Sequence, residues 1–220
     1  MNAGRPREFD MDQAVERALA LFWQCGYEGT SMSDLTDALG ITRASLYAAF
    51  GSKEGLFQRV MDRYEAEAGG YRIAADQAPT SLEAVRLWLT GPVELHGNKK
   101  NPAGCLGVQG ALACGVESDA IRSDLASRRH QGEVAIRRRL QRAAKEHDLP
   151  GEDDPADLAR YLSALIYGMA VLAAGGATRG ELKGVADVAF RHWPKSKEKS
   201  KEETREKPKS KRARRRPGAS

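Results

Sequence analysis

Residues 31–53, SMSDLTDALGITRASLYAAFGSK, constrain the fold more than any other stretch of this chain, because they encode two short helices joined by a tight turn. Ser31 and Asp34 form a capping-box pair at the start of the first helix. Gly40 ends that helix, because glycine adopts the left-handed conformation without steric cost. Thr42 then caps the second helix. The stretch therefore predicts a helix-turn-helix unit.

The second helix of this unit has an outward face suited to the major groove of DNA. Its outer side chains include Arg43, Ala44 and Tyr47, which leave the helix slim enough to enter the groove. We expect Arg43 to hydrogen-bond to base edges and Ala44 to pack on a thymine methyl group. Phosphate contacts are expected from Thr42, Tyr47 and Lys53, and helix N-termini favour such contacts.

Further candidates for DNA contact lie outside that helix. Ser31 is one of them, and Arg5, in a short arm over residues 1–9, can reach the minor groove or the backbone. A disordered terminus explains the arm equally well. The tail 195–220 is strongly charged and poor in apolar residues, so we expect it to be disordered. Its basic run at 211–216 either raises non-specific DNA affinity or only keeps the chain in solution.

The stretch GYEGTSMSDLTDALGITRASLYAAFGSKEGLF, which starts at Gly26, resembles the DNA-binding half of the tetracycline-repressor (TetR-like) family of bacterial regulators. The resemblance covers roughly the first quarter of the chain. At Ala49 this chain departs from the family pattern, which often has His there, so one phosphate or packing contact is in doubt. The matching positions are Gly26, Tyr27, Thr30, Ser31, Gly40, Leu46, Tyr47, Phe50, Lys53, Glu54 and Leu56.

Beyond this unit the chain shows only helical periodicity, so the predicted fold class is all-α. We expect a three-helix helix-turn-helix domain over residues 1–52 and a helical ligand-binding and dimerisation domain over 53–194. The helix at 53–68 links the two, and the resemblance implies that it transmits the ligand signal. A break is predicted at Gly91–Pro92. The remaining helices are predicted at 81–97, 104–114, 119–147, 156–174 and 178–193.

The last two predicted helices are candidates for a subunit interface. The first of them is apolar on most sides and must be buried on more than one side, and Ala164 and Gly168 would let another helix approach closely. The resemblance implies a four-helix interface between two subunits, and a symmetric dimer would match a palindromic operator. A monomer that buries these side chains in its own core is the alternative. The candidate interface residues are Leu165, Met169, Leu172, Phe190 and Trp193.

The chain has three cysteines without paired CxxC spacing, which argues against a disulfide framework or a zinc site, and we expect neither metal nor cofactor. Cys25 is expected to be a small buried residue. Cys105 lies at a predicted helix start, where the helix dipole favours the reactive thiolate. Residues 102–115 resemble a Gly-Cys-Leu segment of TetR-like regulators, some of which sense electrophiles or oxidants. Cys105 is therefore a candidate redox switch, and the plain alternative is a packing residue.

A small-molecule pocket is the other way in which such a chain could sense a signal. The resemblance places it among the middle helices of the C-terminal half, and apolar walls with a few polar groups suit a hydrophobic or aromatic ligand. Most of the candidates are equally compatible with an ordinary core. The candidate lining residues are Trp88, His96, Leu106, Gln109, Tyr161, Ile166, Tyr167 and Met169.

Together these features predict a cytoplasmic DNA-binding regulator rather than an enzyme, because the four histidines lack catalytic partners at a recognisable spacing. The resemblance implies a repressor that an inducer, either a small molecule or an electrophile or oxidant, releases from a palindromic operator. Neither a signal peptide nor an apolar run of membrane-spanning length is expected, so no membrane partner is predicted. The alternative is a non-specific architectural DNA-binding protein driven by the basic tail. Preference for one operator would separate the two functions.

Overall fold

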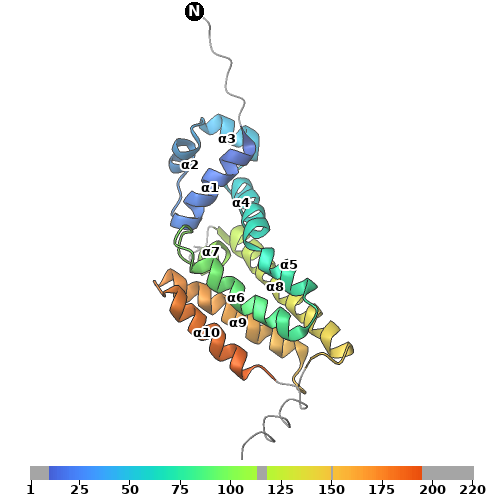
Figure 1. Ribbon diagram of the computed structural model, residues 1–220. Coiled ribbons are helices and arrows are strands. Elements are labelled where there is room, and N and C mark those ends of the chain that lie inside the picture. The colour runs from blue at the N-terminus through green and yellow to red at the C-terminus, as the bar shows by residue number, and fades with distance from the viewer. Residues whose placement is uncertain (1–9, 113–117, 150, 195–220) are drawn as a thin grey trace, which may run out of the picture.

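The computed structural model describes residues 10–112, 118–149 and 151–194. Within these ranges every regular element is an α-helix, which confirms the predicted all-α class. Figure 1 shows a small N-terminal domain at one end of the molecule and a larger helical bundle below it. The small domain contains α1 (Met11–Cys25), α2 (Met32–Leu39) and α3 (Arg43–Phe50).

Helix α4 (Lys53–Ala68) descends from the small domain to the bundle (Figure 1). In the bundle, α9 packs against α6, α8 and α10, and α5 packs along α6. The bundle helices are α5 (Gly70–Gln77), α6 (Ser81–His96), α7 (Leu106–Leu112), α8 (Asp119–Lys145), α9 (Pro155–Ala174) and α10 (Arg179–His192).

The helix ends of the N-terminal domain follow the capping residues in the sequence. The Asp10 carboxylate accepts hydrogen bonds from the backbone N–H groups of Asp12 and Gln13, and α1 begins at the next residue. Gly40 takes the left-handed conformation with φ of 68° and ends α2. Thr42 and Ser52 cap α3 and α4 in the same way as Asp10 caps α1. Local capping therefore determines where each of these helices starts.

The predicted break at Gly91–Pro92 is wrong, because α6 runs without interruption from Ser81 to His96. Pro92 is buried among apolar residues of the bundle, and this packing offsets the backbone hydrogen bond that proline cannot make. Gly91 has another role, since a Cβ atom there would lie 2.2 Å from the ring of Tyr71. The glycine allows α5, a helix that the sequence analysis did not predict, to pack closely on α6.

Two hydrophobic clusters organise the molecule. One fills the N-terminal domain around Phe22, Leu46 and Phe57 and continues to Leu106 of α7 and Leu125 of α8. The other is the core of the bundle, formed by residues of α5, α6, α8, α9 and α10. The first cluster therefore joins the small domain, through α4, to α7 and α8.

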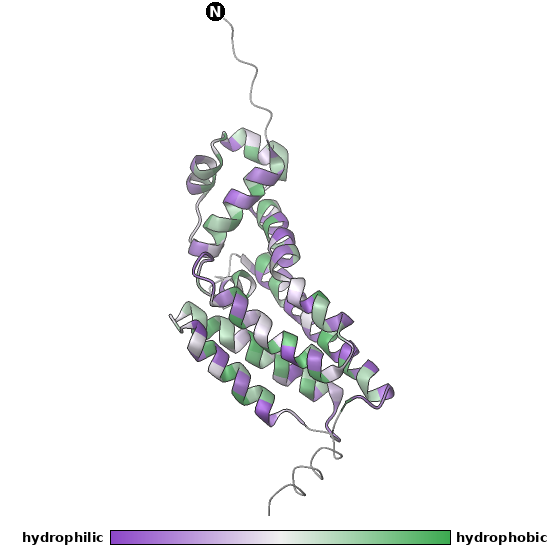
Figure 2. Cartoon of the chain, in the orientation of Figure 1, coloured by the Kyte–Doolittle hydropathy of each residue, from purple (hydrophilic) through white to green (hydrophobic). Residues whose placement is uncertain are grey.

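Helix α9 has 20 residues and is long and apolar enough to cross a membrane by length and composition alone. The expectation that no apolar run reaches that length is therefore corrected. Figure 2 shows hydrophobic residues concentrated along this helix. Much of that surface, including Leu158, Leu162 and Met169, is buried against the neighbouring helices. Its apolar character is that of the central helix of a bundle.

Candidate functional site

The start of α2, the first helix of the helix-turn-helix unit, is held by reciprocal hydrogen bonds. The Ser31 hydroxyl accepts from the Asp34 N–H at 3.1 Å, and the Asp34 carboxylate accepts from the Ser31 N–H at 2.7 Å. These bonds from the Ser31 side chain and backbone lower the pKa of Asp34. Ser31 thus stabilises the unit as the N-cap of α2. Arg5, the predicted DNA contact in the N-terminal arm, lies outside the described residues.

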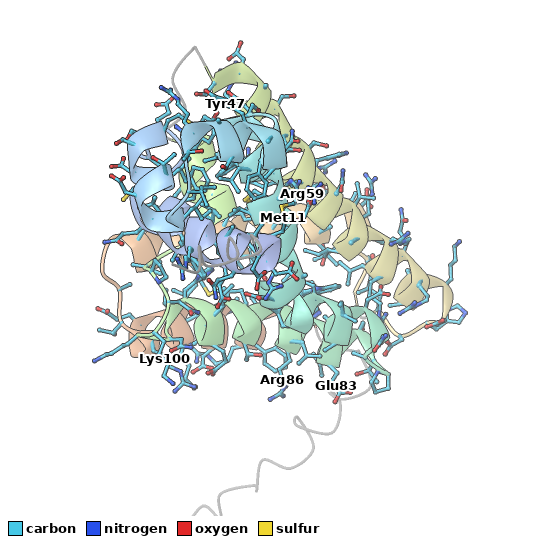
Figure 3. The ribbon with its side chains drawn as sticks, turned by 90° about the horizontal axis from the view of Figure 1, so that it is seen from above. Met11, Tyr47, Arg59, Glu83, Arg86 and Lys100 are labelled. Atoms are coloured by element: carbon cyan, nitrogen blue, oxygen red, sulfur yellow. The ribbon has the colours of Figure 1, made fainter. Side chains whose placement is uncertain are left out.

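Helix α3 turns one face into the domain and the other toward solvent. Leu46 and Phe50 are buried, whereas Arg43, Ala44 and Tyr47 are exposed. Figure 3, which views the molecule from above, labels Tyr47 on this exposed helix. The Arg43 guanidinium lies 6.0 Å from the centre of the Tyr47 ring. The structure therefore brings the three predicted contact residues together on one outward surface.

Lys53 is held at the first turn of α4 by an aromatic contact. Its Nζ lies 4.2 Å from the centre of the Tyr27 ring, which in turn packs edge-on against Phe57. Burial lowers the pKa of Lys53, and the neighbouring carboxylates Glu54 and Glu28 oppose that effect. Thr42 caps α3 by accepting a hydrogen bond from the Ser45 N–H at 3.1 Å. Lys53 and Thr42 thus lie at the N-termini of α4 and α3.

A second group of functional candidates lies where the N-terminal domain meets the bundle. The Trp23 indole N–H of α1 donates to the Gly104 carbonyl at 3.0 Å. The Tyr64 hydroxyl of α4 donates to the Cys105 sulfur at 3.3 Å. The Trp23 and Tyr64 rings meet edge-on with 4.8 Å between their centres. The loop that leads into α7 is therefore bonded to both α1 and α4.

Three small cavities surround this junction. The largest of these three, of about 60 Å³, lies among α5, α6, α8 and α9, whereas a larger hollow of about 210 Å³ lies between α6 and α10. Two others, of about 10 Å³ and 30 Å³, are lined by Cys105 and Tyr64. Arg72 and Tyr167 line all three. By volume, the cavity of about 60 Å³ has room for only a few water molecules.

The predicted pocket residues divide between these cavities and the core. Trp88, Ile166 and Tyr167 line the cavity of about 60 Å³, and His96 lines the one of about 10 Å³. Tyr161 is 44% exposed and lines none of the described cavities. Leu106 and Met169 are fully buried, and the Gln109 amide donates to the Ala103 carbonyl at 2.7 Å.

Sequence reasoning missed Tyr71 and Arg72, which line the cavity of about 60 Å³ from α5. Helix α5 begins at the second of two adjacent glycines, Gly69 and Gly70. Tyr71 and Ala75 lie four residues apart, and this helical spacing is the signal that could have drawn attention to α5. Cys25 was also misjudged, because its side chain is exposed at the end of α1 rather than buried.

Burial dominates the electrostatics of the junction. It raises the pKa of Tyr64 well above its ordinary value, and the nearby Cys105 adds to the effect. Burial also raises the pKa of Tyr167. In His96, burial lowers the pKa to about 4, with a smaller contribution from the positive charge of Arg72. His96 is therefore neutral at physiological pH.

The buried neutral His96 predicts a stability loss in mild acid. Because its pKa falls from 6.5 to about 4 on folding, the unfolded chain binds a proton between these values that the folded chain does not. The free energy of unfolding should therefore decrease as the pH falls from 6.5 to 4, by about 3 kcal/mol at most. His96→Gln should reduce that loss in urea titrations at several pH values. His130→Gln, at an exposed position of α8, is the control. An unchanged pH dependence in His96→Gln would contradict the assignment.

The outer face of α9 and α10 carries apolar side chains that the described part of the chain does not cover. The most exposed are Val171 and Leu172 of α9, each 48% exposed, and Val188 of α10, at 47%. Of the predicted interface residues, Leu165 and Phe190 are half-buried. Met169 and Trp193 lie in the core of their own subunit.

Comparison with known proteins places this architecture in a family. Residues 14–60 match the family model described as bacterial regulatory proteins, tetR family. The chain is 34% identical over 193 residues to the HTH-type transcriptional repressor ComR of Escherichia coli strain K12, covering 87% of this chain and 92% of that protein. The chain belongs to the TetR family. It is a DNA-binding transcriptional regulator and not an enzyme, as the sequence predicted.

Two further relatives support this membership across most of the chain. An uncharacterised HTH-type regulator, YezE of Bacillus subtilis strain 168, is 31% identical over 188 residues, covering 84% of this TetR-family regulator and 97% of YezE. A cysteine mutant of the TetR-family regulator CifR, solved with 26-bp double-strand operator DNA, is 38% identical with a TM-score of 0.81. That alignment covers 87% of this chain and 100% of the CifR chain.

Proposed function

We propose that this TetR-family regulator is a cytoplasmic homodimeric repressor that reads a palindromic operator with α3 and is released by an inducer acting on the bundle. The observation that carries the proposal is the outward surface of Arg43, Ala44 and Tyr47 on a helix whose other face is anchored by Leu46 and Phe50. A capped helix with a small outer face and an arginine in its first turn fits the major groove. The operator-bound structure of CifR supports the same use of DNA.

Arg43→Ala tests whether α3 reads sequence. Loss of a hydrogen-bonded base contact should weaken operator binding by about 1–3 kcal/mol and binding to random DNA very little. Fluorescence anisotropy with the operator and with a scrambled duplex, both at one fixed salt concentration, measures the two affinities. Arg63→Ala, which removes a partly exposed arginine ion-paired to Glu67 on α4, is the matched control. Equal losses of affinity for both duplexes would show that Arg43 contacts only phosphate groups.

The competing function, a non-specific architectural DNA-binding protein, rests on the basic tail 195–220, which lies outside the described residues. The same anisotropy experiment separates the two functions. A regulator should prefer its operator to random DNA by about a thousandfold or more. Equal affinity for both duplexes would favour the architectural function.

We propose that the exposed apolar face of α9 and α10 is the dimer interface. Val171, Leu172 and Val188 supply large apolar surface, while Ala164 and Gly168 of α9 are small and exposed, which favours a close helix approach. A two-fold axis through this face would pair the same surface on both subunits and present two α3 helices to two half-sites. Met169 and Trp193 would then support the interface from inside each subunit.

We propose Cys105 as the point where electrophiles act. Its sulfur accepts a hydrogen bond from Tyr64 of α4, and the neighbouring carbonyl of Gly104 accepts one from Trp23 of α1. The positive charge of Arg72 lies within electrostatic reach of the sulfur. An added group at Cys105 would disturb both bonds, and with them the position of the DNA-binding domain. The alternative, that Cys105 only fills space, predicts no effect of alkylation on DNA binding.

A further inference from the structure

Four charged side chains join α4 to α8 beside the junction of the two domains. The Arg128 guanidinium of α8 donates to the carboxylates of Asp62 and Glu65 on α4, each at 2.9 Å. It also donates to Asp124 on its own helix at 2.9 Å. The three bonds use Nη2, Nη1 and Nε, so every nitrogen of the guanidinium is engaged. We call these four residues the α4–α8 clasp.

Arg128 is the centre of the clasp and its most enclosed member. Its side chain is 17% exposed, whereas that of Asp62 is 64% exposed. Burial opposes the charge of Arg128, but hydrogen bonds to Asp124 and Asp62 and the nearby charge of Glu65 raise its pKa above the ordinary value. An isolated surface ion pair stabilises little, but a partly enclosed network of charge-assisted hydrogen bonds holds its members in one arrangement.

The position of the clasp matters because α4 carries the DNA-binding domain. Helix α4 packs closely on α1 of that domain and less closely on α5 and α7 of the bundle. Its Met61 and Tyr64 belong to the apolar cluster that continues into α7, while the neighbouring Asp62 and Glu65 bond to α8. Apolar packing is non-directional, whereas hydrogen bonds depend on angle. The clasp therefore adds the directional contact that fixes how α4 is tilted against the bundle.

The balance of charge explains why a cation is required at this point. Asp62, Glu65 and Asp124 all lie within 2.9 Å of the same guanidinium. Without that group, three carboxylates would face one another across two helices, and like charges at short range repel. Arg128 thus permits α4 to lie beside α8, and its loss would drive the two helices apart.

We propose that Arg128 is a positioning residue for DNA binding, which acts through Asp62 and Glu65 to hold α4, and with it α3, at one angle to the bundle. The inference rests on the proposed function, because it concerns an operator with two half-sites. A dimer reads both half-sites only when the separation of its two α3 helices matches theirs. A broken clasp would let each DNA-binding domain adopt several angles, so that affinity for the best operator falls and tolerance of altered half-site spacing rises.

Hydrogen exchange measured by mass spectrometry on the full chain tests the clasp without DNA. Arg128→Met should accelerate amide exchange in residues 61–68 of α4 by about tenfold, because local opening of this segment no longer breaks bonds to α8. Arg122→Met is the matched control, since Arg122 lies on the same helix and is ion-paired to Asp119 of that helix. Exchange in α4 that is equal in the two variants would overturn the inference.

Operators of different half-site spacing test the consequence for DNA binding. A duplex that the wild-type chain selects from a random library supplies the operator, and base pairs added or removed at its centre change the spacing. Arg128→Met should bind the selected operator about tenfold more weakly, within the range of typical coupling between sites. It should also lose less affinity than the wild type when the spacing is changed. A uniform loss at every spacing would indicate general destabilisation and contradict a positioning role.

The carboxylates of the clasp supply a test by sign. Asp62→Asn combined with Glu65→Gln should weaken operator binding in the wild type but strengthen it in Arg128→Met, where the two changes relieve repulsion. A scrambled duplex at the same salt concentration corrects for the general effect of removing two negative charges. An effect of the same sign in both backgrounds would refute the inference. Failure of the wild-type chain to select any duplex would count against the proposed function, while hydrogen exchange would still decide whether Arg128 holds α4.

Discussion

Leu172→Glu is expected to convert the dimer into monomers and to weaken operator binding by about a hundredfold or more. Leu172 is 48% exposed in the single chain and lies on the apolar face of α9 and α10. A carboxylate buried in an apolar interface without a partner is strongly unfavourable. Separate monomers would also bind each half-site independently. Linking two half-site contacts in one dimer raises the affinity by a factor of about 10² to 10⁴. Sedimentation velocity at micromolar concentration and anisotropy with the operator measure the two effects.

Ile73→Glu is the matched control for the dimer experiment. Ile73 is 60% exposed on α5, so the substitution places the same charge at another exposed apolar position, away from α9 and α10. This variant should remain dimeric and should bind the operator as the wild type does. A wild-type chain that sediments as a monomer, or a Leu172→Glu variant that stays dimeric, would show that this face is not the interface.

Alkylation of Cys105 by N-ethylmaleimide should weaken operator binding by about a hundredfold, within the range of typical allosteric coupling. The thiol adds across the double bond of the maleimide, so that one S–C bond forms and the thiol proton moves to the adjacent carbon. The cavities beside Cys105 measure only about 10 Å³ and 30 Å³, too little for the added ring. The adduct must displace neighbours such as Tyr64 and His96, and Tyr64 belongs to the helix that carries the DNA-binding domain.

The alkylation experiment uses variants that leave one thiol at a time. A chain with Cys25→Ser and Cys114→Ser retains only Cys105. It should bind the operator before treatment and lose that affinity once mass spectrometry shows one adduct per chain. A chain with Cys105→Ser and Cys114→Ser retains the exposed Cys25 on the DNA-binding domain and is the matched control. It should react faster than the first variant, because its thiol is exposed, and should still bind DNA. Full modification of Cys105 with unchanged affinity would identify it as a packing residue.

The sequence by itself determined the DNA-binding unit, because short helices are specified by groups close together in the chain. Ser31 with Asp34, Thr42 with Ser45, and Gly40 act over three or four residues, and the structure shows the hydrogen bonds and the left-handed turn that they predict. The outward placement of Arg43, Ala44 and Tyr47 follows from the same local periodicity, since Leu46 and Phe50 can be buried only on the other face.

Only the tertiary structure decided which partner covers each apolar or polar group. Periodicity indicates that α9 is apolar on most sides, but not that Met169 faces its own core while Leu172 stays exposed. Gly91 was read as a helix break, and its function as the contact point for Tyr71 of α5 appears only when the two helices are packed. The bonds of Trp23 to Gly104 and of Tyr64 to Cys105 join residues far apart in the chain. Such contacts depend on how helices are arranged in space, which short-range sequence patterns do not encode.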